Sequence, residues 1–548
     1  MSASAVPHGP QTDGETVIRG GTVYDGGGGP PFEGDVVVAG EHVVAVGRSR
    51  PGGAQLDARG LAVAPGFINV LSWANESLIE DGHGQSDLHQ GVTLEVLGEG
   101  ESMGPLNEAM KHELVEHQSD IRYEVEWTTL GQYLEYLERR GVAPNVASFV
   151  GAATVRTHVL GYDDRRPTPQ ELEQMRMLVR SAMQDGAVGV AGALIYAPGC
   201  YAQTDELTEL ARVAGEHGGV FAAHLRSEGD RLLEALAELI EIAQAASVRA
   251  EIYHLKAAGK ANWGKLDTAI ARIEAARAAR VPVCADMYTY TAGATGLNAT
   301  MPPWVQEGGP EAWRERLRDP LVRTRVEREM TTTAQGWENL FLLAGPDNIR
   351  FTAFRSDSLR PYTGRTLADV AAERGLSPAQ TAMRLVAEDE SRVGAAFFLM
   401  SEDNVRRQVA QPWMSFCSDS IAAAPEGVFL RSRPHPRAYG SFARLLGRYV
   451  REEGIVPLEE AIRRLTSLPA RNLGLHGRGA LVPGSFADVV VFDPACVADH
   501  ATYEEPHRYA TGVVHVLVNG IPVIRDGEHT GALPGRVVRG PGWQAWRR

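Results

Sequence analysis

Short apolar runs alternate with amphipathic segments through the middle of the chain. This alternation predicts parallel β-strands that are joined by helical crossovers. Eight of the runs have the length of a buried strand, which indicates the α/β fold class and a (β/α)8, TIM-like barrel. These runs lie near residues 63–70, 91–98, 146–152, 187–191, 218–224, 249–254, 282–287 and 414–419.

The segment after the third run carries the signals of a helix start and a helix end. Thr168 is placed to cap the helix, Pro169 takes the first helical position and Glu171 completes a capping box. Gly186 then follows the last helical residue. The pattern therefore predicts a strand, helix and strand unit at this place.

Both ends of the chain differ from the middle in their pattern of apolar and turn-forming residues. Residues 16–62 and 481–545 contain short Val-rich runs that Gly and Asp turns interrupt, which predicts antiparallel strands. Since neither end alone buries a core, we expect one small β-sandwich domain built from both termini, with a barrel of residues 63–480 inserted between them. Charged helical segments near 300–410 predict an insertion over the barrel mouth, where loops commonly shape substrate choice.

Composition narrows the function classes. The chain has 548 residues, 44% of them hydrophobic, and a formal net charge of -15, which argues against nucleic acid as a partner. The four cysteines are scattered without CxxC spacing, as in a reduced protein. No secretion signal or membrane-spanning run is visible. We therefore expect a soluble, cytoplasmic protein with a small-molecule substrate, no nucleic-acid or membrane partner, and possible homo-oligomers.

Three residues of types that bind metal ions lie at the ends of predicted strands. His224 ends FAAH, His254 ends EIYH and Asp419 ends SFCSD. The carboxyl ends of the strands in such a barrel meet at one rim, so these side chains are expected to converge. Two imidazoles and a carboxylate suit a divalent ion such as zinc, with a coordination position left for water.

Strand alternation places further reactive side chains on the same face, because residues two apart point the same way. Lys256 follows His254 by two positions, and Arg226 follows His224 by two. Asp286, Tyr288 and Tyr290 continue the pattern at the end of the seventh strand. Cations and phenol groups are therefore expected to face the metal.

Eight passages, in order, carry a resemblance to a known family. They are APGFIN (64–69), GVTLEVLGEGESMGP (91–105), HLRSE (224–228), HLKAAG (254–259), DMYTYTAGATG (286–296), SDS (418–420), HPRAYGSFARLLG (435–447) and TSLPARNLGLHGRGALVPGSFADVVVFDP (466–494). Through them the chain resembles the amidohydrolase superfamily and, within it, the N-acyl-D-amino-acid deacylase (D-aminoacylase) family.

The resemblance implies roles for individual residues. It makes His224 and His254 ligands of a tightly held zinc ion and Asp419 the catalytic carboxylate. It assigns Lys256, a tyrosine of the YTY pair (Tyr288 or Tyr290), and Arg437 of HPR to the carboxylate of an acylated amino acid. Charge supports the last assignment independently, since Arg offers a fork that matches a carboxylate and Lys a point charge.

The sequence departs from the family pattern at two places. The family follows its APGFID motif with His-x-His, which supplies a second metal position, whereas Leu71 and Trp73 stand here. The family's cysteine ligand after the second strand is also missing, and Glu99 and Glu101 lie in that region. A glutamate can replace a thiolate on zinc. We favour Glu99, which shares a strand face with Glu95 and Leu97, over Glu101 as the third ligand.

These observations lead to one hypothesis and two alternatives. The leading hypothesis is an amidohydrolase with one zinc ion per chain that hydrolyses the amide of an N-acyl amino acid, with Asp419 as general base and then general acid. One alternative is a hydrolase or tailoring enzyme that acts on another peptide-like or cyclic amide. The other is a catalytically silent barrel that binds a small carboxylate.

Overall fold

Parallel strands form the centre of the computed structural model, which describes residues 14–47, 53–332 and 336–545. In barrel order they are β6 (Phe67–Asn69), β7 (Val92–Leu97), β8 (Asn145–Ser148) with its continuation β9 (Val150–Gly151), β10 (Gly189–Ala193), β11 (Val220–His224), β12 (Arg249–Ile252), β13 (Val283–Met287) and β17 (Met414–Phe416). Each predicted run overlaps one of these strands, so the predicted (β/α)8 barrel is confirmed. A hydrogen bond connects the loop after the last strand to the loop after the first strand: the Asp419 N–H donates to the carbonyl of Leu71 at 2.9 Å.

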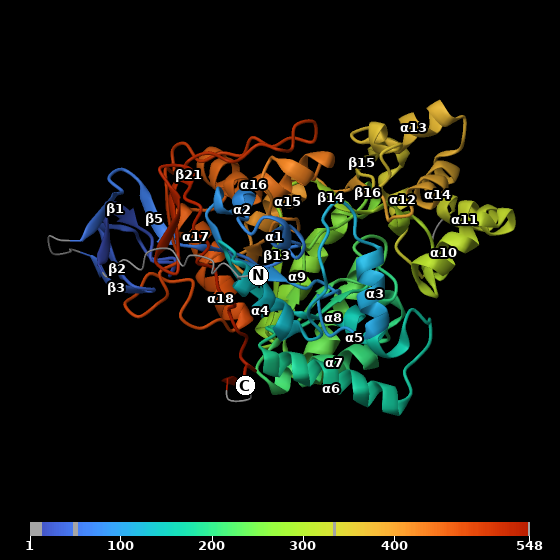
Figure 1. The fold of residues 1–548 in the computed structure, drawn as a ribbon, viewed down its shortest axis with the longest axis horizontal. Coiled ribbons are helices and arrows are strands. Elements are labelled where there is room, and N and C mark those ends of the chain that lie inside the picture. The colour runs from blue at the N-terminus through green and yellow to red at the C-terminus, as the bar shows by residue number, and fades with distance from the viewer. Residues whose placement is uncertain (1–13, 48–52, 333–335, 546–548) are drawn as a thin grey trace, which may run out of the picture.

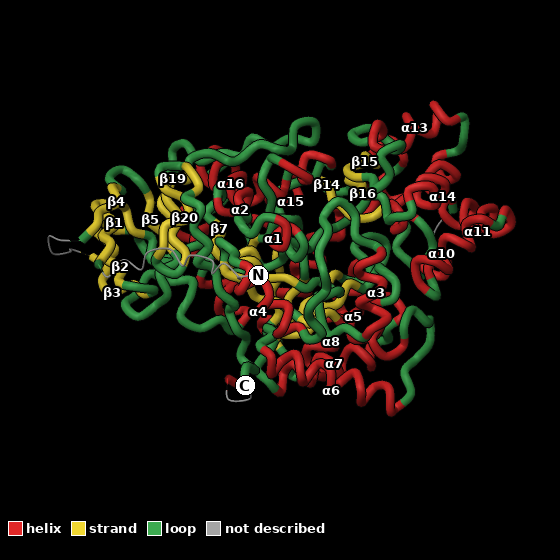
Figure 2. The backbone as a smooth tube through the Cα atoms, in the orientation of Figure 1, coloured by secondary structure: helices red, strands yellow, loops and turns green. Residues whose placement is uncertain are grey.

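Helices lie around the strands (Figure 2), and buried apolar residues of helices and strands pack into one core. The predicted capping box is confirmed at α6, where the Thr168 hydroxyl accepts from the Glu171 N–H and the Glu171 carboxylate accepts from the Thr168 N–H. Among the described residues, no helix combines the length and the apolar character that crossing a membrane requires. The helices around the barrel are α1 (Ser77–Glu80), α2 (Gln85–Leu88), α3 (Glu108–Glu116), α4 (Leu130–Arg140), α5 (Ala152–Leu160), α6 (Pro169–Asp185), α7 (Thr204–Glu216), α8 (Leu232–Ala246), α9 (Leu266–Ala278), α15 (Glu402–Val409), α16 (Arg437–Arg444), α17 (Leu458–Leu465) and α18 (Ser467–Leu473).

Strands from both ends of the chain share one nine-stranded sheet in the described structure. Figure 1 shows the blue strands of the N-terminal part beside the red strands of the C-terminal part. Antiparallel pairing of β5 with β18 joins the two groups, and Val-rich positions from both fill a separate apolar core. The strands are β1 (Glu15–Val23), β2 (Phe32–Ala39), β3 (His42–Gly47), β4 (Ala54–Asp57), β5 (Ala62–Pro65), β18 (Val489–Phe492), β19 (Val513–Val518), β20 (Ile521–Arg525) and β21 (Glu528–His529).

The segment between β13 and β17 forms a subdomain on the opposite side of the barrel from the nine-stranded sheet (Figure 1). Within it, β14 pairs with β16, which in turn pairs with β15. The subdomain has an apolar core of its own. Its elements are β14 (Ala292–Gly296), α10 (Gly309–Arg318), α11 (Pro320–Thr331), α12 (Leu340–Ala344), β15 (Ile349–Ala353), α13 (Leu367–Arg374), α14 (Pro378–Asp389) and β16 (Gly394–Phe398).

Some ionisable side chains are buried on the barrel strands. Glu251 on β12 is 1% exposed and accepts from the Cys284 thiol at 2.6 Å. Burial, and then the nearby Asp286 carboxyl, raises the pKa of Glu251 to about 8. An acid whose pKa rises on folding binds a proton more tightly in the native state, so its contribution to stability is lost as the pH rises.

Glu251→Gln is expected to reduce the pH dependence of stability. Wild type should lose roughly 3 kcal/mol more unfolding free energy than the variant between pH 5.5 and pH 8.5, because only wild type must ionise Glu251 there. Urea denaturation at both pH values measures this difference. Glu234→Gln, at an exposed position of α8, serves as the control. An equal loss in Glu251→Gln and wild type would show that Glu251 does not cause the effect.

Candidate active site

Strand ends bring the predicted metal-binding residues together. His224 is the last residue of β11, His254 lies two residues beyond β12 and Asp419 lies three beyond β17. The three residues are buried, with exposed fractions of 4%, 3% and 7%. The structure therefore gathers all three at the carboxyl rim of the barrel, where reactive groups of this fold lie.

Two of these residues have an unusual backbone conformation. The φ angle is +33° at His254 and +48° at Asp419, in the left-handed region that costs non-glycine residues roughly 1–3 kcal/mol. Hydrogen bonds hold both positions: Asp286 Oδ1 accepts from the His254 N–H at 2.8 Å, and the Leu71 carbonyl accepts from the Asp419 N–H at 2.9 Å. Strain retained at two converging residues is typical of a functional site.

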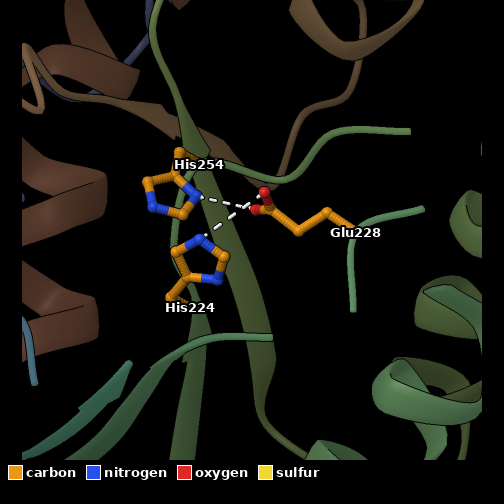
Figure 3. A group of neighbouring side chains, drawn as sticks. All are labelled: His224, Glu228 and His254. Carbon is orange, nitrogen blue, oxygen red and sulfur yellow. Dashed lines mark ion pairs between the residues drawn. The ribbon is translucent and has the colours of Figure 1, made fainter. Parts of the chain in front are cut away.

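The two histidines form a group with Glu228 that could hold a metal ion (Figure 3). The imidazole rings lie 4.7 Å apart, and the Glu228 carboxylate points toward both of them. One of its oxygens is 3.6 Å from His224 Nε2 and the other is 3.1 Å from His254 Nδ1. Sequence reasoning did not single out Glu228, although it ends the HLRSE passage that carried the resemblance.

A second group shares His254 and contains Glu99 and Asp419. Glu99 follows β7 by two residues, is 4% exposed, and places Oε1 3.0 Å from His254 Nε2. Glu101 is exposed and belongs to neither group. The three predicted ligands are thus divided between the groups, since His224 and Glu99 occur in different ones and His254 in both.

The protonation of the histidines matters for metal binding. Burial lowers the pKa of His224 to about 4, so its imidazole is neutral near pH 7. His224 Nδ1 lies 3.0 Å from the Leu225 carbonyl, to which it must donate, and this leaves the Nε2 lone pair for a ligand. Burial and the ammonium group of Lys256 lower the pKa of His254, but the surrounding carboxylates outweigh both and raise it to about 10.

These groups fit a zinc ion. Neutral imidazole and carboxylate oxygen are ordinary zinc ligands, and the hydrogen bond at His224 Nδ1 fixes its tautomer as it does in known metal sites. The proton on His254 would leave when a metal binds, as ligand protons generally do. The buried acids of the two groups supply the negative charge that a divalent cation requires.

Asp419 has the surroundings of an acid–base group. Its Oδ2 lies 2.8 Å from Arg437 Nη1, and its Oδ1 accepts a hydrogen bond from Trp73 Nε1 at 3.2 Å. Burial raises the pKa of Asp419, whereas the Arg437 guanidinium opposes the rise, and the net shift is upward. A raised pKa brings a carboxylate closer to the range in which it both takes and gives a proton.

The cations predicted to bind a substrate carboxylate also lie here. Lys256 Nζ is 2.6 Å from Glu228 Oε1 and 2.8 Å from His254 Nδ1. The guanidinium of Arg437 stacks on the Tyr288 ring at 4.4 Å, and Lys256 approaches the same ring at 5.7 Å. Both cations therefore lie against one tyrosine ring, beside the metal-binding groups.

Two residues expected at the site point elsewhere. The Tyr290 hydroxyl donates to Asp499 Oδ2 at 3.1 Å, and Arg226 pairs with Glu238 at 2.9 Å. β13 ends at Met287 and β11 at His224, so both residues lie beyond the strand whose alternation was used to place them. Of the YTY pair, only Tyr288 contacts Lys256 and Arg437 through its ring among the described residues.

Comparison with known proteins decides the family. Residues 55–524 match the model of the amidohydrolase family. The chain is a member of the amidohydrolase family. Two relatives from Alcaligenes xylosoxydans xylosoxydans resemble this amidohydrolase over nearly its whole length. D-aminoacylase is 34% identical, with 96% of this chain and 97% of the relative covered, and N-acyl-D-glutamate deacylase is 33% identical, with 96% of each covered.

Solved structures agree with the sequence comparison. The amidohydrolase matches a crystal structure of D-aminoacylase with a TM-score of 0.78 and 34% identity, covering 96% of this chain and 99% of that one. It matches N-acyl-D-glutamate deacylase from Bordetella bronchiseptica with a TM-score of 0.78 and 33% identity, covering 96% and 100%. That deacylase was crystallised with zinc and a phosphonate inhibitor that mimics the tetrahedral intermediate.

Proposed function

We propose that this amidohydrolase removes the acyl group from an N-acyl-D-amino acid with one zinc ion held by His224, His254 and Glu99. The observation that carries the proposal is the convergence of two histidines, a buried glutamate and Asp419 at one barrel rim. The overall similarity to D-aminoacylase, N-acyl-D-glutamate deacylase and N-acyl-D-aspartate deacylase supports the substrate class.

We favour Glu99 over Glu228 as the third ligand because of their different neighbours. Glu228 Oε1 forms a 2.6 Å ion pair with the Lys256 ammonium group, which competes with a metal ion for that oxygen. Glu99 Oε1 faces His254 Nε2, a nitrogen that can itself bind the metal once it loses its proton. A His2Glu set with a free position is also an established arrangement for catalytic zinc.

The protein's own groups account for the proton transfers. When bound, zinc would supply Lewis-acid activation of water and of the scissile carbonyl. Asp419 takes a proton from the attacking water and then delivers it to the nitrogen of the departing amine. Its upward-shifted pKa makes the second transfer easier than for an ordinary aspartate.

Arg437, Lys256 and Tyr288 would hold the substrate's α-carboxylate. Arg437 offers two parallel N–H donors and Lys256 a point charge, which together distinguish an acylated amino acid from a neutral amide. Both cations are paired with site carboxylates in the structure, Arg437 with Asp419 and Lys256 with Glu228. A substrate carboxylate must therefore compete with these two ion pairs.

Paired N-acetyl-D- and N-acetyl-L-amino acids, with neutral and acidic side chains, test this proposal. The zinc-loaded protein is expected to release free amino acid from D-substrates and not from their L-counterparts, as measured by amine detection. Carboxylate-free N-acetyl amines are the matched control and should not react. Zinc binding without release from any N-acetyl amino acid would contradict the proposal and favour another amide substrate or a silent binding barrel.

We also propose that the protein is located in the cytoplasm. Four unpaired cysteines among the described residues favour the reducing cytoplasm.

A further inference from the structure

The Trp73 side chain contacts two carboxylates of the proposed site, Glu99 and Asp419. Its indole Nε1 lies 3.0 Å from Glu99 Oε2 and 3.2 Å from Asp419 Oδ1. Glu99 follows β7 and Asp419 follows β17, so one N–H group joins side chains from two different strand ends. An N–H shared by two buried carboxylates restrains the orientation of both.

Main-chain hydrogen bonds tie the backbone at Trp73 to the loop that carries Asp419. The Trp73 N–H donates to the Ser420 carbonyl at 2.9 Å, and the Asp419 N–H donates to the Leu71 carbonyl at 2.9 Å. The loop that carries Trp73 is therefore paired on both sides with the loop that carries Asp419. Leu71 beside it is fully buried.

Every carboxylate oxygen of Glu99 and Asp419 has a nitrogen neighbour. His254 Nε2 faces Glu99 Oε1, Arg437 faces Asp419 Oδ2, and Trp73 takes the remaining oxygen of each. Indole is a donor only and cannot bind a metal ion. A cation between Glu99 Oε2 and Asp419 Oδ1 would have to displace the indole N–H.

We propose that Trp73 takes the place of a cation between Glu99 and Asp419. Its N–H holds Glu99 in the orientation that binds the metal and Asp419 in the orientation that reaches substrate, and its bulk excludes a second ion. This inference rests on the proposed zinc amidase function. Trp73 acts through Glu99 and Asp419, so it is a positioning residue.

Trp73→Phe tests the positioning role, because it removes the N–H and keeps the aromatic ring. Zinc affinity, measured by competition with a chromophoric chelator, should fall roughly 10–100-fold, as for other outer-shell partners of metal ligands. The value of kcat should fall by a similar factor, with little change in KM. The visible absorption of the cobalt(II)-loaded protein should also shift, because Glu99 is reoriented.

Trp263→Phe is the matched control. Trp263 is half-buried like Trp73, and its Nε1 donates to the Leu399 carbonyl at 2.8 Å, so the same substitution removes an indole hydrogen bond outside the site. It should leave zinc affinity, kcat and the cobalt spectrum unchanged. Wild-type affinity, rate and spectrum in Trp73→Phe would overturn the inference while leaving the proposed function intact.

The double variant Leu71→His/Trp73→His tests exclusion and does not depend on the folding of Trp73→Phe. It removes the indole and places two imidazoles beside Glu99 and Asp419, so zinc stoichiometry should rise from one to two ions per chain. An unchanged stoichiometry would overturn the claim that Trp73 excludes the second ion. A wild-type chain that binds no zinc would overturn the proposed function, and this inference with it.

Discussion

Asp419→Asn is expected to lower kcat by about 10²–10⁴-fold while zinc remains bound. The amide nitrogen and oxygen of asparagine keep the shape of the side chain but cannot take a proton from water or return it to the departing amine. Binding of zinc should persist, because the proposed ligands His224, His254 and Glu99 are unchanged. The loss should therefore appear in kcat, with KM affected less.

Steady-state kinetics together with metal analysis measure both parts of this prediction. Asp267→Asn, an exposed position on α9, makes the same chemical change away from the site and should retain wild-type kcat. A wild-type rate in Asp419→Asn would remove Asp419 from the mechanism. Loss of zinc from that variant would instead make Asp419 a metal ligand.

His254→Ala is expected to abolish zinc binding and activity together. His254 is the residue that the two candidate groups share, so its removal leaves neither group complete. The loss of zinc affinity should exceed the roughly 10–100-fold effect of changing an outer-shell partner, since a direct ligand is removed. Calorimetric zinc titration of the variant measures this loss.

His217→Ala provides the comparison. His217 precedes β11, at the opposite end of that strand from His224, and its Nδ1 lies 2.9 Å from the Val213 carbonyl. Zinc binding should remain at the wild-type level in this variant. If His254→Ala bound zinc as tightly as His217→Ala, the metal would have to lie outside both groups.

The strand framework of this amidohydrolase could be predicted from its sequence because buried parallel strands are short, continuous apolar runs. Once the runs are placed, barrel geometry alone brings His224, His254 and Asp419 to one rim. The structure buries Glu99 against His254 and leaves Glu101 exposed, a difference that alternation could not supply, because residues two apart share a strand face.

Prediction became less accurate where strands end. Tyr290 and Arg226 lie beyond the last strand residue, where the period of two no longer determines direction, and both point away from the metal-binding groups. Glu228 lies in such a loop as well, and its contact with the histidines depends on how that loop folds. In the sequence, Trp73 is only a residue at a position where the family has a histidine, and the contacts of its N–H with Glu99 and Asp419 depend on how three loops fold together.

The most direct test of the central claim is a zinc titration of metal-free protein, with release of amino acid from an N-acetyl-D-amino acid as the readout. A centre formed by His224, His254 and Glu99 predicts that activity rises linearly and reaches its plateau at about one equivalent of zinc per chain. Activity that rises until two equivalents are bound, or no activity at any zinc concentration, would contradict it.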